Sequence, residues 1–545
     1  MPTATPGERL VEHFTARGLE LRETHISWVF LGPDEVWKVK KPVDFGFLDF
    51  TTRDRRRRAC EAEVELNRRL APEVYLGVVP LVSDSEEGLR VGSGNEASAE
   101  VVDWVVHMRR LDDRRRADHL LASGDLGPEH LEQLATTLAR FHRNADLGEA
   151  NAGGLADVRR NVEENFEQTR EALHNYLEPG QAIEVVEWQR DFLARHGALF
   201  DARRSTARIR DGHGDLRLDH VYFGEAGGPS AADGSCTVLD CIEFNRRFRV
   251  ADVCADVAFL AMDLQARGRA DLSEHFLAAY ARAAGDYDLY PLVDFYESYR
   301  AFVRGKIATF VAEDPTVEYR LRQRAAADAR RFFLLALASE RRSVVPPVVF
   351  AVGGVIASGK STLANALGHA LAAPVVDADH TRKELSGVDA HTPLPEAPWQ
   401  GSYSDRQTET VYDEVLQRGD AVLRSGRSLV LDASFRCREH RLAARDLARR
   451  HGVPFRWVEC RAPLEVCRRR LEERARRPGV SDGRLEIFDA FVARWEEVAA
   501  DEMSEGEGFS IDTREPLETN LARVTRGLSL WPDRSGSKKA GSFSS

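Results

Sequence analysis

Lysine is scarce in this chain. Of its 76 basic residues only eight are lysines, and the rest are arginines. Lysine supplies a compact point charge where arginine supplies a planar fork, so a lysine in such a chain marks a place that needs the compact charge. Lys38, Lys40 and Lys41 form one cluster, and Lys360 is a fourth member of the small set. These positions are the first candidates for functional sites.

Long apolar runs and paired cysteines are also missing. No run of about 18 apolar residues, the length of a membrane span, is present, and the first ten residues, MPTATPGERL, contain no apolar signal core. The seven cysteines include no C-x-x-C pair, which is typical of reduced core thiols rather than of a disulfide framework. We therefore expect a cytoplasmic protein with no membrane partner.

Composition and length indicate the class of protein and the number of folding units. Hydrophobic residues make up 43% of the chain and charged residues 30%, as in a soluble globular protein. The net charge of −12 argues against a nucleic-acid partner. At 545 residues the chain exceeds one ordinary domain of about 100–200 residues, so we expect two or three folding units. Nothing in the sequence indicates the oligomeric state.

A complete phosphate-binding motif lies in the second half. Residues 354–361 read G-V-I-A-S-G-K-S, after the apolar run 348–352 and before a stretch with helical apolar spacing at 363–371. Between a buried strand and a helix, the glycines let backbone N–H groups surround a triphosphate. The lysine reaches the outer phosphates, and the serine hydroxyl can hold Mg²⁺. The predicted nucleotide-binding residues are Gly354, Ser358, Gly359, Lys360, Ser361 and Thr362.

The first half begins with a strand-rich region. Two extended runs, 26–31 and 35–40, are joined by Gly-Pro-Asp and predict a hairpin. On the second strand Lys38 and Lys40 share one face. A helix from about residue 53 follows and carries Glu63, and from about residue 128 the pattern is helical. This order predicts a small strand-rich lobe followed by a larger helical lobe.

Two carboxylates in the helical lobe have the spacing of a phosphoryl-transfer site. Asp215 lies in the loop His213-Gly-Asp215, and Asp240 follows an apolar run 25 residues later. Such a pair can orient and deprotonate a hydroxyl with one carboxylate and hold Mg²⁺ on the phosphates with the other. Asp252 and Asp256 are expected to cap or brace the loop.

These motifs resemble the aminoglycoside phosphotransferase and choline kinase branch of the protein-kinase-like fold, over residues of about 20–335. The resemblance implies that Asp215 is the catalytic base and Asp240 the Mg²⁺ ligand, with Glu243 as a supporting carboxylate. Lys38 matches the lysine that anchors ATP, with Lys40 as competitor. Glu63 matches its ion-pair partner.

The chain departs from that family at two places. No G-x-G-x-x-G precedes Lys38, so the hairpin at Gly32 would have to cover the phosphates. His220 stands where the family has a metal-binding asparagine, which leaves open an inactive, kinase-like binding module. His213 and His220 with Cys236 and Cys241 could also be drawn as a zinc site, although their spacing matches no common ligand pattern.

The second half continues with further candidate groups. Asp379 follows a second apolar run and could take the acceptor's proton, and Asp432 ends a third run, where it could orient Mg²⁺-bound water. Both could instead be helix N-caps. The helix after residue 463 carries arginines at three-to-four spacing, which form either a lid over the triphosphate or a solvated basic face. These arginines are Arg470, Arg474 and Arg477, with Arg474 as the catalytic candidate.

The order of motifs over 348–515 resembles the small-molecule and zeta-toxin-like P-loop kinases. The whole chain resembles bacterial fused aminoglycoside-phosphotransferase-like and ATP-binding kinase proteins. The expected fold is an α+β bilobal kinase-like domain (1–340), a linker (341–347), an α/β P-loop domain with a parallel sheet (348–532) and a disordered tail (533–545).

The resemblance implies an ATP- and Mg²⁺-dependent phosphotransferase that acts on hydroxyls of small molecules, with Asp240, Ser361 and His220 as candidate metal ligands. Two alternatives stay open. The first half could only bind and regulate, or the P-loop half could be a nucleotide-sensing switch. The acceptor of neither half can be read from the sequence.

Overall fold

The computed structural model describes residues 6–531, except for 45, 47, 85–87, 93–99, 150–151, 225–235, 338–344, 390–391, 393–395, 397–398, 475–482 and 504–505. The predicted tail and most of the predicted linker lie outside these residues. The chain forms two compact units, one of residues 1–267 and 299–336 and the other of residues 268–298 and 337–545. Among the described helices, none is both long and apolar enough to cross a bilayer.

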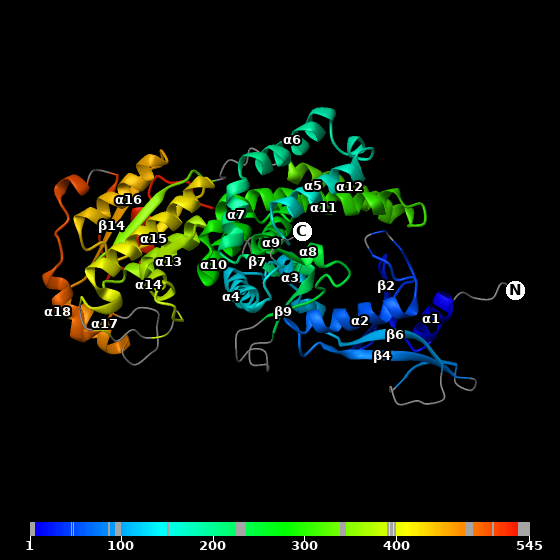
Figure 1. The fold of residues 1–545 in the computed structure, drawn as a ribbon. Helices are drawn as coiled ribbons and strands as arrows, with labels where there is room; N and C mark the ends of the chain where they lie inside the picture. Colours follow the sequence, from blue (N-terminus) through cyan, green and yellow to red (C-terminus); the bar gives the residue numbers. More distant parts are fainter. Residues whose placement is uncertain are drawn as a thin grey trace, which may run out of the picture. The chain divides into compact units, whose positions relative to one another are not determined.

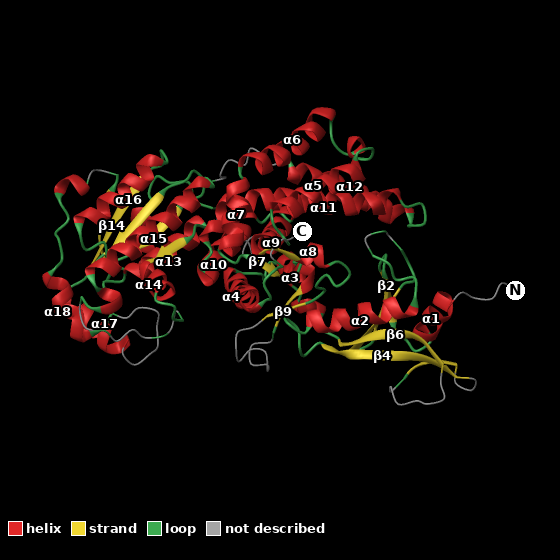
Figure 2. Cartoon of the chain, in the orientation of Figure 1, coloured by secondary structure: helices red, strands yellow, loops and turns green. Residues whose placement is uncertain are grey.

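Unit 1 begins with an antiparallel sheet of six strands in the order β1-β2-β3-β6-β4-β5. The predicted hairpin is β2–β3, with Val29 opposite Lys38. Helix α2 packs on β4 and β6 (Figures 1 and 2). The bounds are α1 Pro6–Thr15, β1 Glu20–Glu23, β2 Ser27–Leu31, β3 Glu35–Lys40, α2 Arg53–Asn67, β4 Tyr75–Asp84, β5 Gly88–Val91 and β6 Glu100–Arg109.

The rest of unit 1 is mainly helical, as predicted. Its α4 buries Leu131, Leu134, Leu138 and Phe141, the residues at helical spacing. Two short antiparallel strand pairs, β7–β10 and β8–β9, flank the loops that carry the acidic motifs. The bounds are α3 Ala117–Ser123, α4 Pro128–Asn144, α5 Leu155–Thr169, α6 Pro179–Arg195, α7 Gly197–Ser205, β7 Ile209–Asp211, β8 Val221–Phe223, β9 Cys236–Val238, α8 Arg246–Arg249, β10 Val250–Asp252, α9 Val253–Ala266, α11 Tyr290–Glu313 and α12 Tyr319–Ala336. The first part of α11 belongs to unit 2, as does α10 Ala270–Ala284.

Unit 2 contains a parallel sheet of five strands in the order β12-β13-β11-β14-β15. Alternate residues of a strand point to opposite faces, and Phe350 and Val352 of β11 pack with Leu363 and Leu367 of α13 in one buried cluster. Helix α16 also contacts β11 and β14. The bounds are β11 Val349–Gly353, α13 Lys360–Leu371, β12 Val375–Asp377, α14 Ala378–Leu385, α15 Asp405–Arg424, β13 Leu429–Asp432, α16 Arg438–Arg450, β14 Phe455–Arg461, α17 Leu464–Arg474, α18 Leu485–Ala493, β15 Gly508–Asp512 and α19 Leu517–Val524.

The fold class agrees with the sequence prediction, whereas the division of the chain differs in one segment. The sequence predicted one boundary, at 341–347. In the structure, residues 268–298, which hold α10 and the first part of α11, form a compact unit with the P-loop half. The prolines at 346 and 347 gave a clear signal for the boundary. No local pattern reports with which core an amphipathic helix packs.

Candidate active sites

The P-loop of unit 2 has the backbone that its glycines predict. Gly354 and Gly359 have φ of 149° and 95°, a region that residues with a side chain rarely adopt. A Cβ at Gly354 would lie 2.5 Å from both the Cys460 carbonyl oxygen and Ser358 Oγ. Gly359 is the N-cap of α13, so Lys360 and Ser361 begin the helix. Ser358 is fully buried, and its hydroxyl has no hydrogen-bond partner among the described residues.

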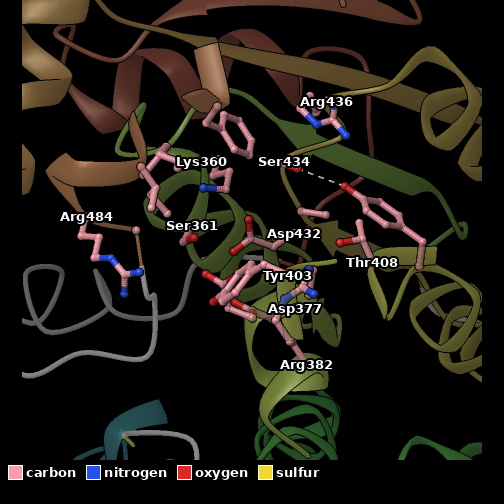
Figure 3. Close-up of a pocket in the computed structure, with 18 of the residues that line it drawn as sticks. Lys360, Ser361, Asp377, Arg382, Tyr403, Thr408, Asp432, Ser434, Arg436 and Arg484 are labelled. Carbon is pink, nitrogen blue, oxygen red and sulfur yellow. Dashed lines mark hydrogen bonds between the residues drawn. The ribbon is translucent and has the colours of Figure 1, made fainter. Parts of the chain in front are cut away.

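Three carboxylates face the P-loop across one cavity. Lys360 and Ser361 line this cavity together with Asp377, Asp379 and Asp432 (Figure 3). Asp377 and Asp432 are direct partners in the register of β12 and β13. Each is the last residue of its strand, so both lie at the same edge of the sheet. Thr362, also predicted to bind nucleotide, is exposed and is not part of this lining.

Asp379 and Asp432 are the sequence candidates for helix N-caps, but the aspartate that caps α14 is Asp377. The N-cap of α14 is Asp377, which accepts a hydrogen bond from the His380 N–H at 2.9 Å. The sequence therefore missed Asp377 as a lining residue, although its position at the end of an apolar run gave a signal. Asp432 is 3% exposed, and among the described residues neither of its oxygens has a hydrogen-bond partner of ordinary geometry.

The two paired aspartates differ in their acidity. Burial and the neighbouring charge of Asp377 raise the pKa of Asp432 to about 7. Burial acts on Asp377 in the same direction, but the hydrogen bond from His380 and the charge of Arg282 outweigh it and lower the pKa of Asp377 to about 2. Two neighbouring carboxylates with separated pKa values are a common feature of sites that handle protons or metal ions.

Arginines and aromatic rings line the rest of the cavity. Arg382 lies over the Tyr403 ring, with 4.5 Å between its guanidinium carbon and the ring centroid, and donates to the Ser402 carbonyl oxygen. Arg436 lies over the Trp399 ring at 4.9 Å. All four of Arg382, Tyr403, Trp399 and Arg436 line the cavity. Tyr403, Trp399 and Arg436 come from segments whose path no local sequence pattern reports.

The predicted arginine lid is described in part. Arg470 of α17 donates to the Ala357 carbonyl oxygen of the P-loop at 3.2 Å and to Thr513 Oγ1 at 3.0 Å. Arg474 is exposed at the end of the helix. Arg477 lies outside the described residues. The described part of the helix therefore reaches the P-loop through Arg470, while the role predicted for Arg474 stays a prediction.

Segment 268–298 also reaches this site. Arg282 of α10 donates to Asn365 Oδ1 of α13 at 2.8 Å, and its other nitrogen lies 3.5 Å from an Asp377 oxygen. The Tyr287 hydroxyl donates to the Val375 carbonyl oxygen at 2.8 Å. Arg282 therefore links the P-loop helix to the strand that presents Asp377.

The site of unit 1 is built around two lysines and three carboxylates. Lys38 Nζ lies 2.8 Å from both Glu63 Oε1 and Asp240 Oδ1. Lys40 Nζ lies 2.5 Å from Glu63 Oε2 and contacts Glu243. Lys38 lines the cavity of unit 1, whereas Lys40 is fully buried behind it. This geometry favours Lys38 as the lysine that meets a ligand and gives Lys40 a supporting position.

Electrostatics keep Lys38 and Asp240 of this group ionised. Burial disfavours charge on Lys38, but Asp240 and Glu63 outweigh it and raise the pKa of Lys38 well above its usual value. Burial would likewise raise the pKa of Asp240, yet the charge of Lys38 and its hydrogen bond lower it well below the usual range. Asp240 has φ of 64°, a left-handed conformation that residues with a side chain rarely adopt.

His220 lies between the two predicted carboxylates. Its Nδ1 is 2.9 Å from the Asp215 carbonyl oxygen, and its Nε2 is 2.9 Å from Arg217 Nη2. These contacts imply a neutral ring protonated on Nδ1, because Nε2 accepts from the guanidinium. Nε2 also lies 3.6 Å from an Asp240 oxygen. The histidine thus stands beside both Asp215 and Asp240, where the resemblance places the asparagine.

Asp215 is held by a neighbouring arginine. Arg217 donates to both Asp215 oxygens, at 3.1 and 3.2 Å. Burial alone would raise the pKa of Asp215, but the charge of Arg217 lowers it to about 2. The loop itself is braced as predicted, because Asp256 accepts from the backbone N–H groups of His213 and Gly214 at 2.6 and 2.8 Å.

The four residues considered as a possible zinc site do not lie together in the structure. His213 Nε2 donates to the Leu239 carbonyl oxygen, 2.9 Å away. Across the described part of the chain, His213, His220, Cys236 and Cys241 do not form a common group of metal-ligating atoms. Burial raises the pKa of the Cys236 and Cys241 thiols to about 12, so both are protonated at neutral pH.

Sequence comparisons place this chain among known proteins. A family described as "Phosphotransferase enzyme family" matches residues 40–296, and one described as "AAA domain" matches residues 349–498. The uncharacterized protein Rv2004c of Mycobacterium tuberculosis (strain ATCC 25618 / H37Rv) is 34% identical over 512 residues, which cover 93% of this chain and 94% of that protein. The uncharacterized protein Mb2027c of Mycobacterium bovis matches to the same extent.

The chain therefore belongs to the family of these mycobacterial proteins. It combines an aminoglycoside-phosphotransferase-like domain with a P-loop kinase domain, which confirms the resemblance seen in the motifs. Solved structures with similarity include a choline/ethanolamine kinase family protein from Mesorhizobium loti, with 13% identity, coverage of 59% of this chain and 91% of that chain, and a TM-score of 0.34. A gluconokinase from Sinorhizobium meliloti has 19% identity, coverage of 34% and 91%, and a TM-score of 0.24.

Proposed function

We propose that this protein is a cytoplasmic, ATP-dependent phosphotransferase with two phosphoryl-transfer sites, each acting on a hydroxyl of a small molecule. One observation carries the proposal. In each unit, a cavity combines a lysine suited to phosphates with at least two carboxylates, Lys38 with Asp215 and Asp240, and Lys360 with Asp379 and Asp432. This set is what positioning, metal binding and proton removal in phosphoryl transfer need.

The residues of unit 2 fit a nucleotide and Mg²⁺. Side chains at the P-loop glycines would fill the space that the loop leaves for phosphates. Among the described residues, the buried Ser358 hydroxyl and both Asp432 carboxylate oxygens have no hydrogen-bond partner of ordinary geometry. Lys360 would hold the outer phosphates, and Ser361 and Asp432 the metal ion with its waters. Bound Mg²⁺ would neutralise charge on the transferred group. Asp379 would take the acceptor's proton, with Arg382 orienting the acceptor and Arg474 adding positive charge.

In unit 1, Lys38, held by Glu63, would orient the phosphates of ATP, and Asp240 would hold Mg²⁺. Asp215 would accept the proton of the attacking hydroxyl. His220 faces Asp240 through a nitrogen, whereas Mg²⁺ prefers oxygen ligands. Asp240 is therefore the main metal ligand in this proposal, and His220 is at most a weak one.

A second candidate follows from Arg217. Because this arginine occupies both oxygens of Asp215 and lowers its pKa to about 2, Asp215 is a weak base until the arginine moves. If Arg217 stays in place with substrates bound, unit 1 binds nucleotide without transferring phosphate, and unit 2 is the sole enzyme.

The test uses full-length protein, because residues 268–298 pack with the P-loop half. Wild type, Lys360→Ala and Asp215→Asn are each incubated with ATP, Mg²⁺ and a metabolite extract, and phosphorylated products are identified by mass spectrometry. Two products, one lost in each variant, support two active sites. Loss of every product in Lys360→Ala alone, with none lost in Asp215→Asn, supports the second candidate. Unchanged products in both variants refute the proposal.

A further inference from the structure

The cavity of unit 1 extends away from the phosphate-anchoring lysine to a helical wall. Lys38 and Asp240 line it from the strand side, while α5 and α11 line the opposite part with Asn165, Gln168 and Lys306. Asp215, the proposed base, belongs to the same lining. A base acts on the acceptor's hydroxyl, so the helical wall beyond it is the part of the cavity that meets the acceptor.

Lys306 is an unusual member of that wall. It is one of only eight lysines in the chain. Its Nζ donates to Asn165 Oδ1 at 2.6 Å and to Gln168 Oε1 at 2.8 Å, and both partners are neutral amides. An ammonium has three N–H donors, so these two bonds leave one for a ligand. Burial lowers the pKa of Lys306 to about 8, which still leaves most molecules charged at neutral pH.

The neighbouring carboxylates are already matched by arginines. Glu164, whose charge acts on Lys306, is bound by Arg247 through two hydrogen bonds of 2.8 and 2.6 Å. Arg217 binds Asp215 and also Asp219, the latter at 2.9 Å. Arg304 lies close enough to these two aspartates to interact with their charges. Among the described residues, the cavity-lining side chains of α5 and α11 thus include three cations, Arg300, Arg304 and Lys306, and one carboxylate, Glu164. Of the three cations, Lys306 is the one bound by neutral side-chain amides.

We propose that Lys306 forms a subsite for an anionic group of the acceptor, so that the first site phosphorylates an alcohol that also carries a carboxylate or a phosphate. The inference rests on the proposed transfer function of unit 1. Lys306 has no ion-pair partner among the described residues. A partly desolvated ammonium in that position is costly, and an anion bound to it recovers that cost. If Lys306 only joined α11 to α5, a neutral hydrogen-bond donor would suffice, because both of its partners are amide oxygens. The positive charge therefore points to a further, anionic partner.

The experiment measures binding, so that it does not depend on turnover. Full-length protein carrying Lys360→Ala, which weakens the second site, is saturated with Mg²⁺ and a non-hydrolysable ATP analogue. Calorimetric titrations then use two matched sets of alcohols. One set is glycerol, glycerate, glycerol 3-phosphate and serinol, and the other is glucose, gluconate, glucose 6-phosphate and glucosamine. Each set compares neutral, carboxylate, phosphate and ammonium forms of nearly the same skeleton.

We expect at least one anionic member to bind about tenfold or more tightly than its neutral and cationic counterparts, because a hydrogen bond to a charged group contributes more than a neutral one. Lys306→Gln should remove this preference, and Lys306→Arg should keep it. Lys41→Gln is the matched control, since Lys41 pairs with Glu23 outside the cavity lining. Thermal unfolding of each variant reports whether a change reflects lost stability instead.

Four results overturn the subsite. The first three are preferred binding of serinol or glucosamine, an anion preference that survives Lys306→Gln, and no binding by any of the anionic members. Weaker affinity for the ATP analogue in Lys306→Gln, with acceptor affinity unchanged, also overturns it, because the lysine then serves the nucleotide. Failure of the proposed transfer function gives another result. The Lys306-dependent anion preference is then observed, but no alcohol is phosphorylated in an Asp215-dependent way when ATP replaces the analogue.

Discussion

Asp432 should make Mg²⁺ binding at the P-loop site depend on pH near neutrality. Its pKa is raised to about 7 by burial and by the charge of Asp377. A raised pKa means that the protonated form persists up to neutral pH, and a protonated carboxyl is a poor partner for Mg²⁺ and its waters. Binding should therefore weaken as the pH falls through 7 and strengthen as it rises.

The size of this effect follows from the ionised fraction. A group with a pKa of about 7 is ionised in about one molecule in ten at pH 6 and in about nine in ten at pH 8. The apparent dissociation constant rises as the competent fraction falls, so it should be about tenfold weaker at pH 6 than at pH 8. A tenfold change corresponds to about 1.4 kcal/mol.

The assay follows a fluorescent ADP analogue during Mg²⁺ titration at several pH values. Full-length protein carrying Asp240→Asn is used, so that the metal site proposed for unit 1 does not contribute. Asp432→Asn in the same background is the matched control, because it keeps the shape of the side chain and reports the nucleotide's own titration. A pH dependence of equal size with and without Asp432 would refute the reasoning.

Three further predictions concern both units. Asp215→Asn should lower turnover at the first site and leave ATP affinity nearly unchanged, whereas Asp240→Asn should weaken Mg·ATP binding itself; equal loss of nucleotide affinity in both, measured by calorimetry, would reverse the assigned roles. His220→Asn should preserve or improve Mg²⁺-dependent turnover at the first site relative to Mn²⁺; complete loss of activity would mean that the histidine contacts a substrate. Arg427→Met should destabilise unit 2 by about 3 kcal/mol in denaturant unfolding, since it leaves Glu274 and Asp294 without their shared cation; unchanged stability would show that this contact is unimportant.

The sequence predicted the elements whose signals are local. The P-loop, its flanking strand and helix, and the β2–β3 hairpin all carry residue types that force one backbone, such as Gly354 and Gly359 at positive φ. The acidic loop at Asp215 was found in the same way. A strand of the unit 1 sheet, Gly88–Val91, was missed because it is short and lies beside a stretch rich in Ser, Gly and Glu.

The missed parts of the sites depend on long-range contacts. Asp377 becomes a neighbour of Asp432 only through the pairing of β12 with β13, and Arg282 reaches Asn365 from 83 residues away along the chain. Trp399 and Arg436 enter the cavity from loops. A single sequence reports periodicity and turn chemistry, but not which strand lies beside which. Lys38 and Lys40 lie on the same face of β3, so the sequence could not separate them. The structure does, because Lys38 lines the cavity and Lys40 is fully buried.

The packing of residues 268–298 also bears on how such a chain can be divided. Arg427 binds Glu274 and Asp294 of this segment at 2.6 and 2.9 Å, and Tyr287 bonds to β12. A gene split, or a protease cut, at the stretch 338–344 would leave these residues on the fragment that lacks the P-loop. The P-loop fragment would then lose the partners of the largely buried Arg427 and a contact at the sheet edge. A P-loop unit separated at that boundary should therefore be less stable than the same unit in the intact chain.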